Sequence, residues 1–151
     1  MNEKMDLNKR FLVFSYLFQL STQLETIGSK YIEDFTFKQW YFMLILSNLF
    51  DKAPTLSECA EVIGCSHQNA KQIASKLVDK GYLKIEKDKS DSRVIRLKPT
   101  LKYQRLSEVR LSKDQKFIAE LFNGLSMKEV EVMVKAFMKM EKNLQLMQID
   151  K

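Results

Sequence analysis

Residues 55–100 decide the fold of this chain and read TLSECAEVIGCSHQNAKQIASKLVDKGYLKIEKDKSDSRVIRLKPT. The pattern predicts a helix over residues 66–80. Ser66 suits the N-cap, because its hydroxyl can accept a hydrogen bond from an unpaired amide of the first turn. Gly81 suits the other end, because glycine adopts the left-handed backbone without strain. One face of the helix is apolar at spacings of three and four, and it consists of Ala70, Ile73, Ala74 and Leu77.

The opposite face of this predicted helix is polar and basic, and it carries no acidic residue. Such a face fits the major groove of DNA, where base edges present hydrogen-bond donors and acceptors. The residues that we predict to contact DNA from this helix are Ser66, His67, Gln68, Asn69, Lys71, Gln72, Ser75 and Lys76. A solvated surface helix would show the same pattern, so the flanking segments have to decide between the two interpretations.

A shorter helix is predicted directly before this one. Thr55-Leu56-Ser57-Glu58 has the form of a capping box, in which the threonine hydroxyl and the glutamate carboxylate each satisfy a backbone amide. The inner face of this helix is expected to hold Leu56, Cys59, Ala60 and Ile63. Gly64 ends it, and the next helix starts two residues later. This is the helix-turn-helix arrangement, whose second helix enters the groove of DNA.

After Gly81 the apolar residues alternate along the chain. Alternation predicts two half-buried strands, with Leu83, Ile85, Ile95 and Leu97 as their apolar positions. The polar segment 87–93 would form the tip between them, so the whole region is predicted to be a winged helix. We add Lys89, Asp91 and Arg93 to the predicted DNA contacts, because a cation at such a tip can enter the minor groove. A solvated hairpin loop is the alternative.

The positive charge of the chain is concentrated in this region. The net charge is +6 at pH 7, and residues 66–105 hold 11 Lys or Arg against 4 Asp or Glu. The remainder holds 14 basic and 15 acidic residues. Concentrated basic charge indicates a polyanion-binding site. The alternative function is a winged-helix protein-protein interaction module that uses its basic face on an acidic partner, and absence of salt-dependent duplex binding would favour it.

Helices are predicted on both sides of this region. Thr36-Phe37-Lys38-Gln39 is a second capping box and opens an apolar helix that we expect in the core. Residues 7–31 predict a helix before it, and a third capping box at residues 126–129 opens the last helix. The predicted fold is mainly α with a small β-wing. We expect a winged helix-turn-helix DNA-binding domain at residues 36–100 and a helical dimerisation region at residues 1–35 and 101–151.

The first predicted helix is apolar over much of its circumference, so it has to be covered on more than one side. A second subunit can supply that cover, and a central helix in a monomer is the alternative. The last helix carries an apolar stripe at spacings of three and four, which suits a seam between helices. The predicted dimerisation residues are Phe11, Phe14, Phe18, Val130, Val134, Phe137 and Leu144.

Other classes of protein find little support in the sequence. The apolar runs are too short to span a membrane, and residues 1–10 do not resemble a secretory signal, so we expect a cytoplasmic protein without membrane contact. A single histidine, no Gly-rich phosphate loop and no metal-binding spacing of Cys or His argue against an enzyme, a metal site or a cofactor.

The two cysteines are interpreted separately. Cys59 falls on the apolar face of its helix and is expected to be an inert core residue. Cys65 comes just before the N-terminus of the next helix, a position that can lower the pKa of a thiol. Oxidation of Cys65 is therefore a hypothesis for weakening DNA binding, and unchanged affinity after peroxide treatment would exclude it. A structural thiol is the alternative.

The sequence resembles the MarR family of bacterial transcriptional regulators over about residues 36–100. The matching segments are TFKQW at 36–40, LSECA at 56–60 followed by Ile63-Gly64, LVDKGYL at 77–83, DSR at 91–93 and LKPT at 97–100. The family wing usually has an Asp-x-Arg element, which Asp91 and Arg93 match, followed by a Leu-x-Leu-Thr-like strand end. Pro99 replaces the commoner Leu, and Lys102-Tyr103 stand where a Gly is usual.

This resemblance implies a homodimer that is joined by its N- and C-terminal helices and binds a pseudo-palindromic operator. In many members a small aromatic or anionic effector releases the protein from DNA, and another branch responds to cysteine oxidation. The resemblance also implies that Asp91 holds the wing and that Arg93 contacts the minor groove. The residues facing the major groove would then be His67, Gln68, Lys71 and Gln72.

Overall fold

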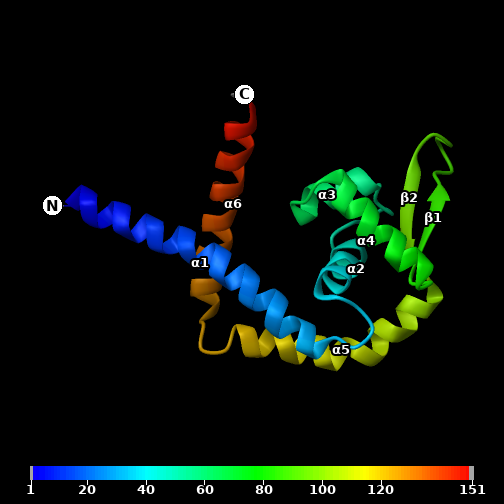
Figure 1. The fold of residues 1–151 in the computed structure, drawn as a ribbon, viewed down its shortest axis with the longest axis horizontal. Coiled ribbons are helices and arrows are strands. Elements are labelled where there is room, and N and C mark those ends of the chain that lie inside the picture. Colours follow the sequence, from blue (N-terminus) through cyan, green and yellow to red (C-terminus); the bar gives the residue numbers. More distant parts are fainter. Residues whose placement is uncertain (1, 150–151) are drawn as a thin grey trace. The chain divides into compact units, whose positions relative to one another are not determined.

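The computed structural model describes residues 2–149 of the chain, and side chains from residue 6 to residue 147. Within this range the structure is mostly helical, with one small antiparallel sheet, which confirms the predicted fold class (Figure 1). The elements in chain order are α1 (Asn2–Tyr31), α2 (Phe37–Asn48), α3 (Leu56–Ile63), α4 (His67–Asp79), β1 (Leu83–Lys87), β2 (Ile95–Pro99), α5 (Leu101–Leu121) and α6 (Met127–Ile149).

The described residues form two compact units, which divide between Lys113 and Asp114. The first unit contains α1 to β2 and the first part of α5, and the second contains the end of α5 and all of α6. The DNA-contact residues predicted from the sequence all lie in the first unit. No helix between residues 2 and 149 is long and apolar enough to cross a membrane.

Helices α2, α3, α4 and α6 begin where the sequence predicts them. All three predicted capping boxes form, between Thr36 and Gln39, Thr55 and Glu58, and Ser126 and Glu129. In the second of these, the Glu58 amide donates to the Thr55 hydroxyl at 3.2 Å and the Thr55 amide donates to the Glu58 carboxylate at 2.6 Å. The Ser66 hydroxyl accepts from the Asn69 amide at 3.2 Å, so Ser66 caps α4 as predicted.

Two glycines end the two helices of the helix-turn-helix. Gly64 has φ 70° and Gly81 has φ 74°, which is the left-handed region that favours glycine. After α4, the Tyr82 amide donates to the Leu77 carbonyl at 2.9 Å and the Gly81 amide donates to the Val78 carbonyl at 2.8 Å. These bonds satisfy carbonyl groups that the helix end would otherwise leave without a partner.

The core of the first unit lies between α2, α3, α4 and the base of the hairpin. Its most completely buried side chains are Phe42, Met43, Cys59, Leu77, Leu83 and Leu97. Trp40 is also buried and packs against the Phe37 ring, so its role is packing. The inner face of α4 is buried at Ala70, Ile73, Ala74 and Leu77, which fixes the opposite face toward the solvent.

The hairpin β1–β2 is antiparallel, with Leu83 opposite Pro99 and Ile85 opposite Leu97. The prediction that both apolar pairs are half-buried is wrong at its outer end, because Ile85 and Ile95 are each 53% exposed. Leu83 and Leu97 are each 2% exposed, whereas Ile85, directly opposite Leu97, and Ile95, nearer the tip, are left largely uncovered. Figure 1 shows the tip pointing away from the start of α5.

The outer edge of β2 is not left open. The Leu97 amide donates to the Pro54 carbonyl in the segment between α2 and α3 at 2.8 Å. The Thr100 amide and hydroxyl donate to the Tyr82 and Gly81 carbonyls at 3.0 and 2.7 Å. The base of the hairpin is therefore held by hydrogen bonds to the backbone on two sides.

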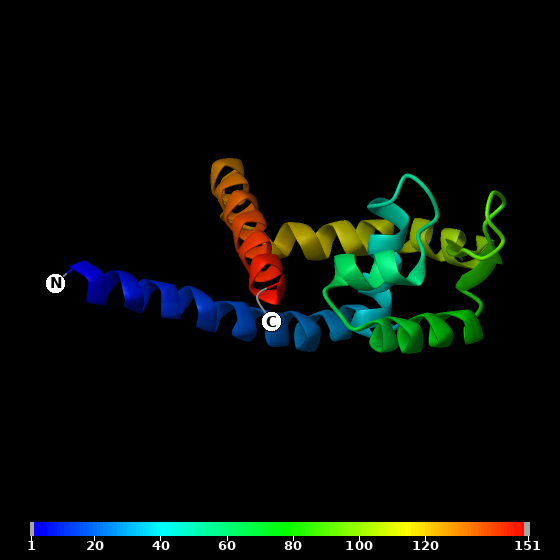
Figure 2. The same cartoon turned by 90° about the horizontal axis from the view of Figure 1, so that it is seen from above.

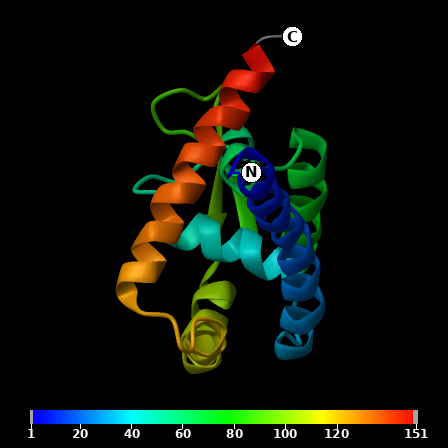
Figure 3. The same cartoon turned by 90° about the vertical axis from the view of Figure 1, so that its left-hand side faces the viewer.

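The first helix, α1, begins earlier than the predicted residue 7 and runs without interruption to Tyr31, as Figure 3 shows. Its close approach to α2 depends on Gly28, since any Cβ at that position would overlap the Phe37 ring. Most of the apolar side chains before Gly28 are exposed within the first unit.

Candidate nucleic-acid interface

The outer face of α4 is fully available to a partner. All eight residues that the sequence predicts on this face are exposed, namely Ser66, His67, Gln68, Asn69, Lys71, Gln72, Ser75 and Lys76. The helix has no acidic residue before its last position, Asp79. Figure 2 shows α4 and the hairpin at the same end of the first unit, so both belong to one surface region.

The first turn of α4 adds favourable electrostatics to this surface. Its N-terminus carries the positive end of the helix dipole, and no acidic side chain in the first turn opposes it. Ser66 satisfies the Asn69 amide. His67 and Gln68 come between these two residues and expose their side chains. A helix start of this kind suits a phosphate group of a nucleic acid.

The hairpin tip is shaped by two aspartates. Asp88 Oδ1 accepts from the Ser90 amide at 2.8 Å and from the Asp91 amide at 3.2 Å. Asp91 Oδ1 accepts from the Arg93 amide at 2.9 Å. Side-chain bonds to the backbone a few residues on are the local chemistry that makes Asp a turn residue. They leave the side chains of Lys89, Asp91 and Arg93 exposed at the tip.

The basic residues of positions 66–105 fall into two groups: those whose charged group has a partner within the part of the chain that the structure describes and those whose charged group has none. A count of charges along the sequence does not distinguish the two. Lys84 and Lys98 form ion pairs with Glu86 at 2.6 and 2.7 Å. Lys80 and Lys102 donate to backbone carbonyls. Six basic side chains between residues 66 and 105 make no ion pair or hydrogen bond with the described residues, namely Lys71, Lys76, Lys87, Lys89, Arg93 and Arg105. The charge available for a polyanion is therefore concentrated on α4 and the tip.

Arg96 belongs to the first group, although the sequence pattern places it among the outward residues of the hairpin. Its Nε donates to Asp88 Oδ2 at 2.9 Å, and its Nη1 donates to Glu58 Oε2 at 3.3 Å and to the Ala53 carbonyl at 3.2 Å. These contacts connect β2 to the tip and to the first turn of α3. The pairing was not predictable from the sequence, because Glu58 lies 38 residues before Arg96.

The carboxylates in this network are held in their charged form. Backbone hydrogen bonds from Ser90, followed by the Arg96 side chain, lower the pKa of Asp88. The Thr55 amide and hydroxyl, with a smaller contribution from Arg96, lower the pKa of Glu58. Glu86 has its pKa lowered to about 2 by hydrogen bonds from Lys84 and Lys98. The hairpin is thus an array of ionised groups at neutral pH.

The two cysteines lie in different environments. Cys59 is buried in the core, as predicted, and burial raises the pKa of its thiol to about 12. Such a thiol is unreactive at neutral pH. Cys65 is partly exposed, and its amide donates to the Ala60 carbonyl at 3.0 Å. The redox role of Cys65 remains a hypothesis.

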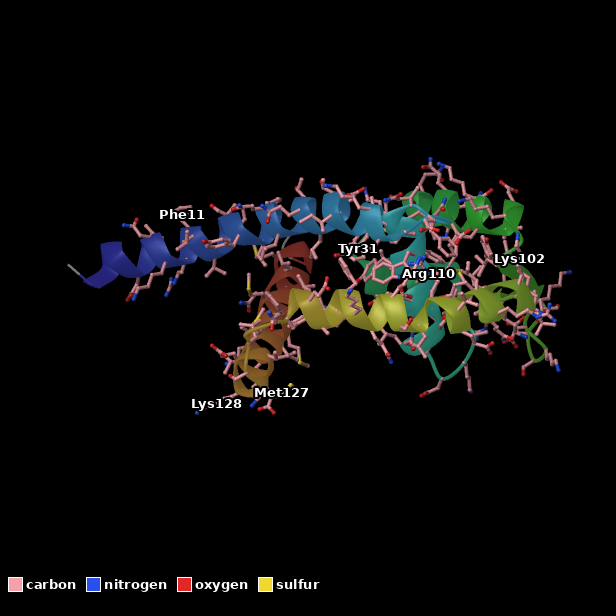
Figure 4. The ribbon with its side chains drawn as sticks, turned by 90° about the horizontal axis from the view of Figure 1, so that it is seen from below. Phe11, Tyr31, Lys102, Arg110, Met127 and Lys128 are labelled. Carbon is pink, nitrogen blue, oxygen red and sulfur yellow. The ribbon has the colours of Figure 1, made fainter. Side chains whose placement is uncertain are left out.

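A buried cation lies where α1 and the first part of α5 meet. Arg110 is only 6% exposed and donates from Nη2 to the Tyr31 carbonyl at 3.5 Å. Figure 4 shows Tyr31 and Arg110 facing each other between the two helices. In the segment between α1 and α2, the Phe35 ring packs against Tyr82 and Tyr103, with centroids 4.8 and 6.2 Å apart. Neither the burial of Arg110 nor the ring contacts of Phe35 were predicted from the sequence.

No protein-family model and no curated protein matches the sequence. Solved structures do match it. One is a MarR protein from Peptoclostridium difficile DA00132, with 25% identity and a TM-score of 0.71, covering 87% of this chain and 86% of that one. Another is a complex of S. aureus MepR with DNA, with 22% identity and a TM-score of 0.74, covering 87% and 96%.

A third structure concerns regulation of DNA binding of Bordetella bronchiseptica BpsR by 6-hydroxynicotinic acid. It has 19% identity and a TM-score of 0.70, and the match covers 85% of this chain and 91% of that one. The fold and the surface together define a winged helix-turn-helix protein. More narrowly, the fold is that of MarR-family transcriptional regulators, which confirms the resemblance found in the sequence.

Proposed function

We propose that this chain is a MarR-like, non-enzymatic transcriptional regulator in the cytoplasm. It binds a pseudo-palindromic double-stranded DNA operator as a homodimer, through recognition helix 66–80 and wing 87–93. The observation that carries this proposal is the exposed outer face of α4, which is polar, basic and without acid up to Asp79. The unpaired cations of the tip lie at the same end of the first unit (Figure 2).

The residues of α4 have distinct proposed roles. Gln68, Asn69 and Gln72 carry amides that can bind the N6 and N7 edge of adenine in a bidentate manner. Lys71 and Lys76 bind guanine or phosphate groups. Arg93 enters the minor groove, where a narrow groove strengthens the negative potential. This assignment makes base reading depend on amides and general affinity depend on lysines.

The homodimer is supported by uncovered apolar surface. On α1, Phe11 is 60% exposed and Phe18 is 65% exposed, and Phe11 projects from α1 in Figure 4. On α6, the exposed apolar residues include Val134, Phe137 and Leu144, while Val130 is partly exposed. Large exposed apolar surfaces mark interaction sites, because water disfavours them. We therefore assign residues 1–35 and 101–151 to dimerisation and residues 36–100 to DNA binding.

Release of the operator by a small aromatic or anionic effector is part of the proposal. Arg110 offers an almost buried cation beside Tyr31, and Phe35, Tyr82 and Tyr103 offer aromatic rings in the same unit. A nearly buried guanidinium suits an anion, which can pair with its charge, and aromatic rings suit a planar ligand, which can stack on them. The effect of 6-hydroxynicotinic acid is named for BpsR, and it supports this chemistry here by analogy only.

The test of DNA binding is fluorescence anisotropy of a labelled duplex with a random-sequence core, titrated at several salt concentrations. We expect submicromolar binding that weakens steeply with salt, because each neutralised phosphate contributes about 0.9 to the log–log slope. No binding at low salt would contradict the proposal and favour an acidic protein partner for the basic face. A Lys84→Ala variant is the control, since this lysine is paired with Glu86.

A further inference from the structure

The conformation of the wing tip depends on the Asp88 carboxylate, both of whose oxygens accept hydrogen bonds. Asp88 Oδ1 accepts from the amides of Ser90 and Asp91, and Asp88 Oδ2 accepts from Arg96 Nε at 2.9 Å. The Asp88 amide also donates to the Val94 carbonyl at 2.8 Å, which closes the tip at its base. One side chain thereby joins the backbone of the tip to β2.

Arg96 extends this connection to the helix-turn-helix. Its Nη1 reaches Glu58 Oε2 in the first turn of α3 and the Ala53 carbonyl before that helix. Glu58 is itself fixed by the capping box with Thr55. The Arg96 side chain is only 25% exposed, and three acceptors engage its donors. Its geometry is that of a bridge within the protein, whereas Arg93 exposes its side chain at the tip.

The bridge ends at the residue proposed to enter the minor groove. Asp88 fixes the amide of Asp91, and Asp91 Oδ1 accepts from the Arg93 amide at 2.9 Å. Hydrogen bonds that involve a charged group are about twice as strong as neutral ones, so each link restrains the next. The backbone position of Arg93 is thus defined relative to α3, and through α3 relative to α4.

We infer that Arg96 is a positioning residue: by joining Asp88 to the first turn of α3, it holds the wing tip in the geometry that presents Arg93 to DNA, without contacting DNA itself. This inference rests on the proposed function. Asp88 is a positioning residue as well, since it links Arg96 to the backbone of the tip. Neither residue matches the Asp-x-Arg element of the wing, which lies at Asp91 and Arg93.

The sharpest test is the Asp88→Asn variant, because a charge effect and a positioning effect predict opposite changes in DNA affinity. Removal of a negative charge from a DNA-facing wing should by itself tighten binding. The asparagine Nδ2 cannot accept from Arg96, so loss of positioning should instead weaken binding about tenfold. Glu86→Gln is the matched control, because it also removes a carboxylate from the hairpin. The Glu86 carboxylate pairs with Lys84 and Lys98 and does not contact the tip.

Binding is measured on the duplex that the wild-type protein selects from a random-sequence pool. Glu86→Gln should bind as tightly as wild type or more tightly, and Asp88→Asn should bind more weakly. In an Arg93→Ala background, Asp88→Asn should cause no further weakening, because the residue that it positions is gone. Unchanged or tighter binding by Asp88→Asn, or equal weakening in both backgrounds, would overturn the inference.

A second measurement does not need DNA and therefore separates this inference from the proposed function. In Arg96→Ala, amide hydrogen exchange at Ser90 and Asp91 should become faster, while Lys98→Ala should leave it unchanged. If the wild-type protein selects no duplex but Arg96→Ala loosens the tip, the proposed function fails and the restraint by Arg96 stands. If exchange at these amides is the same in both variants, the restraint itself is refuted.

Discussion

Lys80 Nζ donates to Gln39 Oε1 at 3.1 Å, although 41 residues separate the two along the chain. The same ammonium donates to the Asp34 carbonyl at 2.8 Å and lies 6.0 Å from the Phe35 ring centroid. Gln39 is buried and completes the capping box of α2. The end of α4 is therefore held against the segment that joins α1 to α2.

Lys80→Met should lower the free energy of unfolding by about 1 kcal/mol, because it removes two hydrogen bonds and keeps the apolar stem. Urea denaturation monitored by circular dichroism measures this. Lys71→Met is the control, because that exposed side chain makes no such bond within the described residues, and its effect should stay within about 0.5 kcal/mol. Equal losses in the two variants would contradict the structural role of Lys80.

Arg93→Ala should weaken the proposed operator binding about tenfold while leaving the proposed dimer intact, because the side chain is exposed at the tip and bonds to no other described residue. Anisotropy measures the affinity, and sedimentation equilibrium measures the oligomeric state. Ser92→Ala, one residue away at the same exposed tip, is the matched control. An Arg93→Ala protein with wild-type affinity would remove this residue from the interface.

Lys76→Ala should weaken binding to all duplexes alike and lower the salt slope by about one unit, because it removes one phosphate contact. Titrations of a selected and a scrambled duplex at several salt concentrations measure both quantities. Lys98→Ala should leave the slope unchanged, since the Lys98 ammonium pairs with Glu86 at 2.7 Å. A loss confined to the selected duplex would mean that Lys76 reads a base.

Gly28→Ala should destabilise the packing of α1 on α2 by about 1–3 kcal/mol, because the new methyl group would overlap the Phe37 ring. Thermal unfolding compares this variant with Ser29→Ala, whose hydroxyl only bonds to the Glu25 carbonyl within α1. Adding Phe37→Leu should recover part of the loss. A Gly28→Ala protein as stable as wild type would show that the two helices can separate freely at this point.

Acid should destabilise the first unit through carboxylates whose folded pKa is depressed. The pKa values of Glu58 and Asp88 lie below their ordinary values of 4.5 and 3.8, and that of Glu86 is about 2. A depressed carboxylate pKa stabilises the fold above its unfolded value, and this contribution disappears as pH falls through the folded value. The melting temperature should therefore fall below about pH 4.5, continuing to about pH 2.

Glu58→Gln offers a direct check of this pH dependence. Glutamine can still complete the capping box but carries no charge to pair with Arg96. The variant should therefore lose less stability than wild type between neutral and acidic pH. Identical pH profiles of melting temperature in the two proteins would exclude Glu58 as a contributor.

The parts that the sequence predicted are those fixed by local chemistry. Capping boxes, left-handed glycines and the apolar stripe of α4 involve residues within one or two turns of each other, so their spacing is visible in the chain. Ile85 and Ile95 show the limit of sequence prediction, because alternation indicates which face of a strand a residue lies on but not whether another element covers it. The contacts of Arg96 with Glu58 and of Lys80 with Gln39 were also not predictable, since these partners lie 38 and 41 residues away along the chain.

The double use of Asp88 has a thermodynamic consequence for binding. The backbone of the tip is already ordered by its bonds to this carboxylate, so in the proposed complex DNA would not have to order a loose loop. Ordering a flexible segment costs about 1–2 kcal/mol of backbone entropy per residue. In this protein the tip loses that entropy when the chain folds and not when it binds. The wing should consequently add little to the heat-capacity change of association, which calorimetry of wild type and Asp88→Asn would compare.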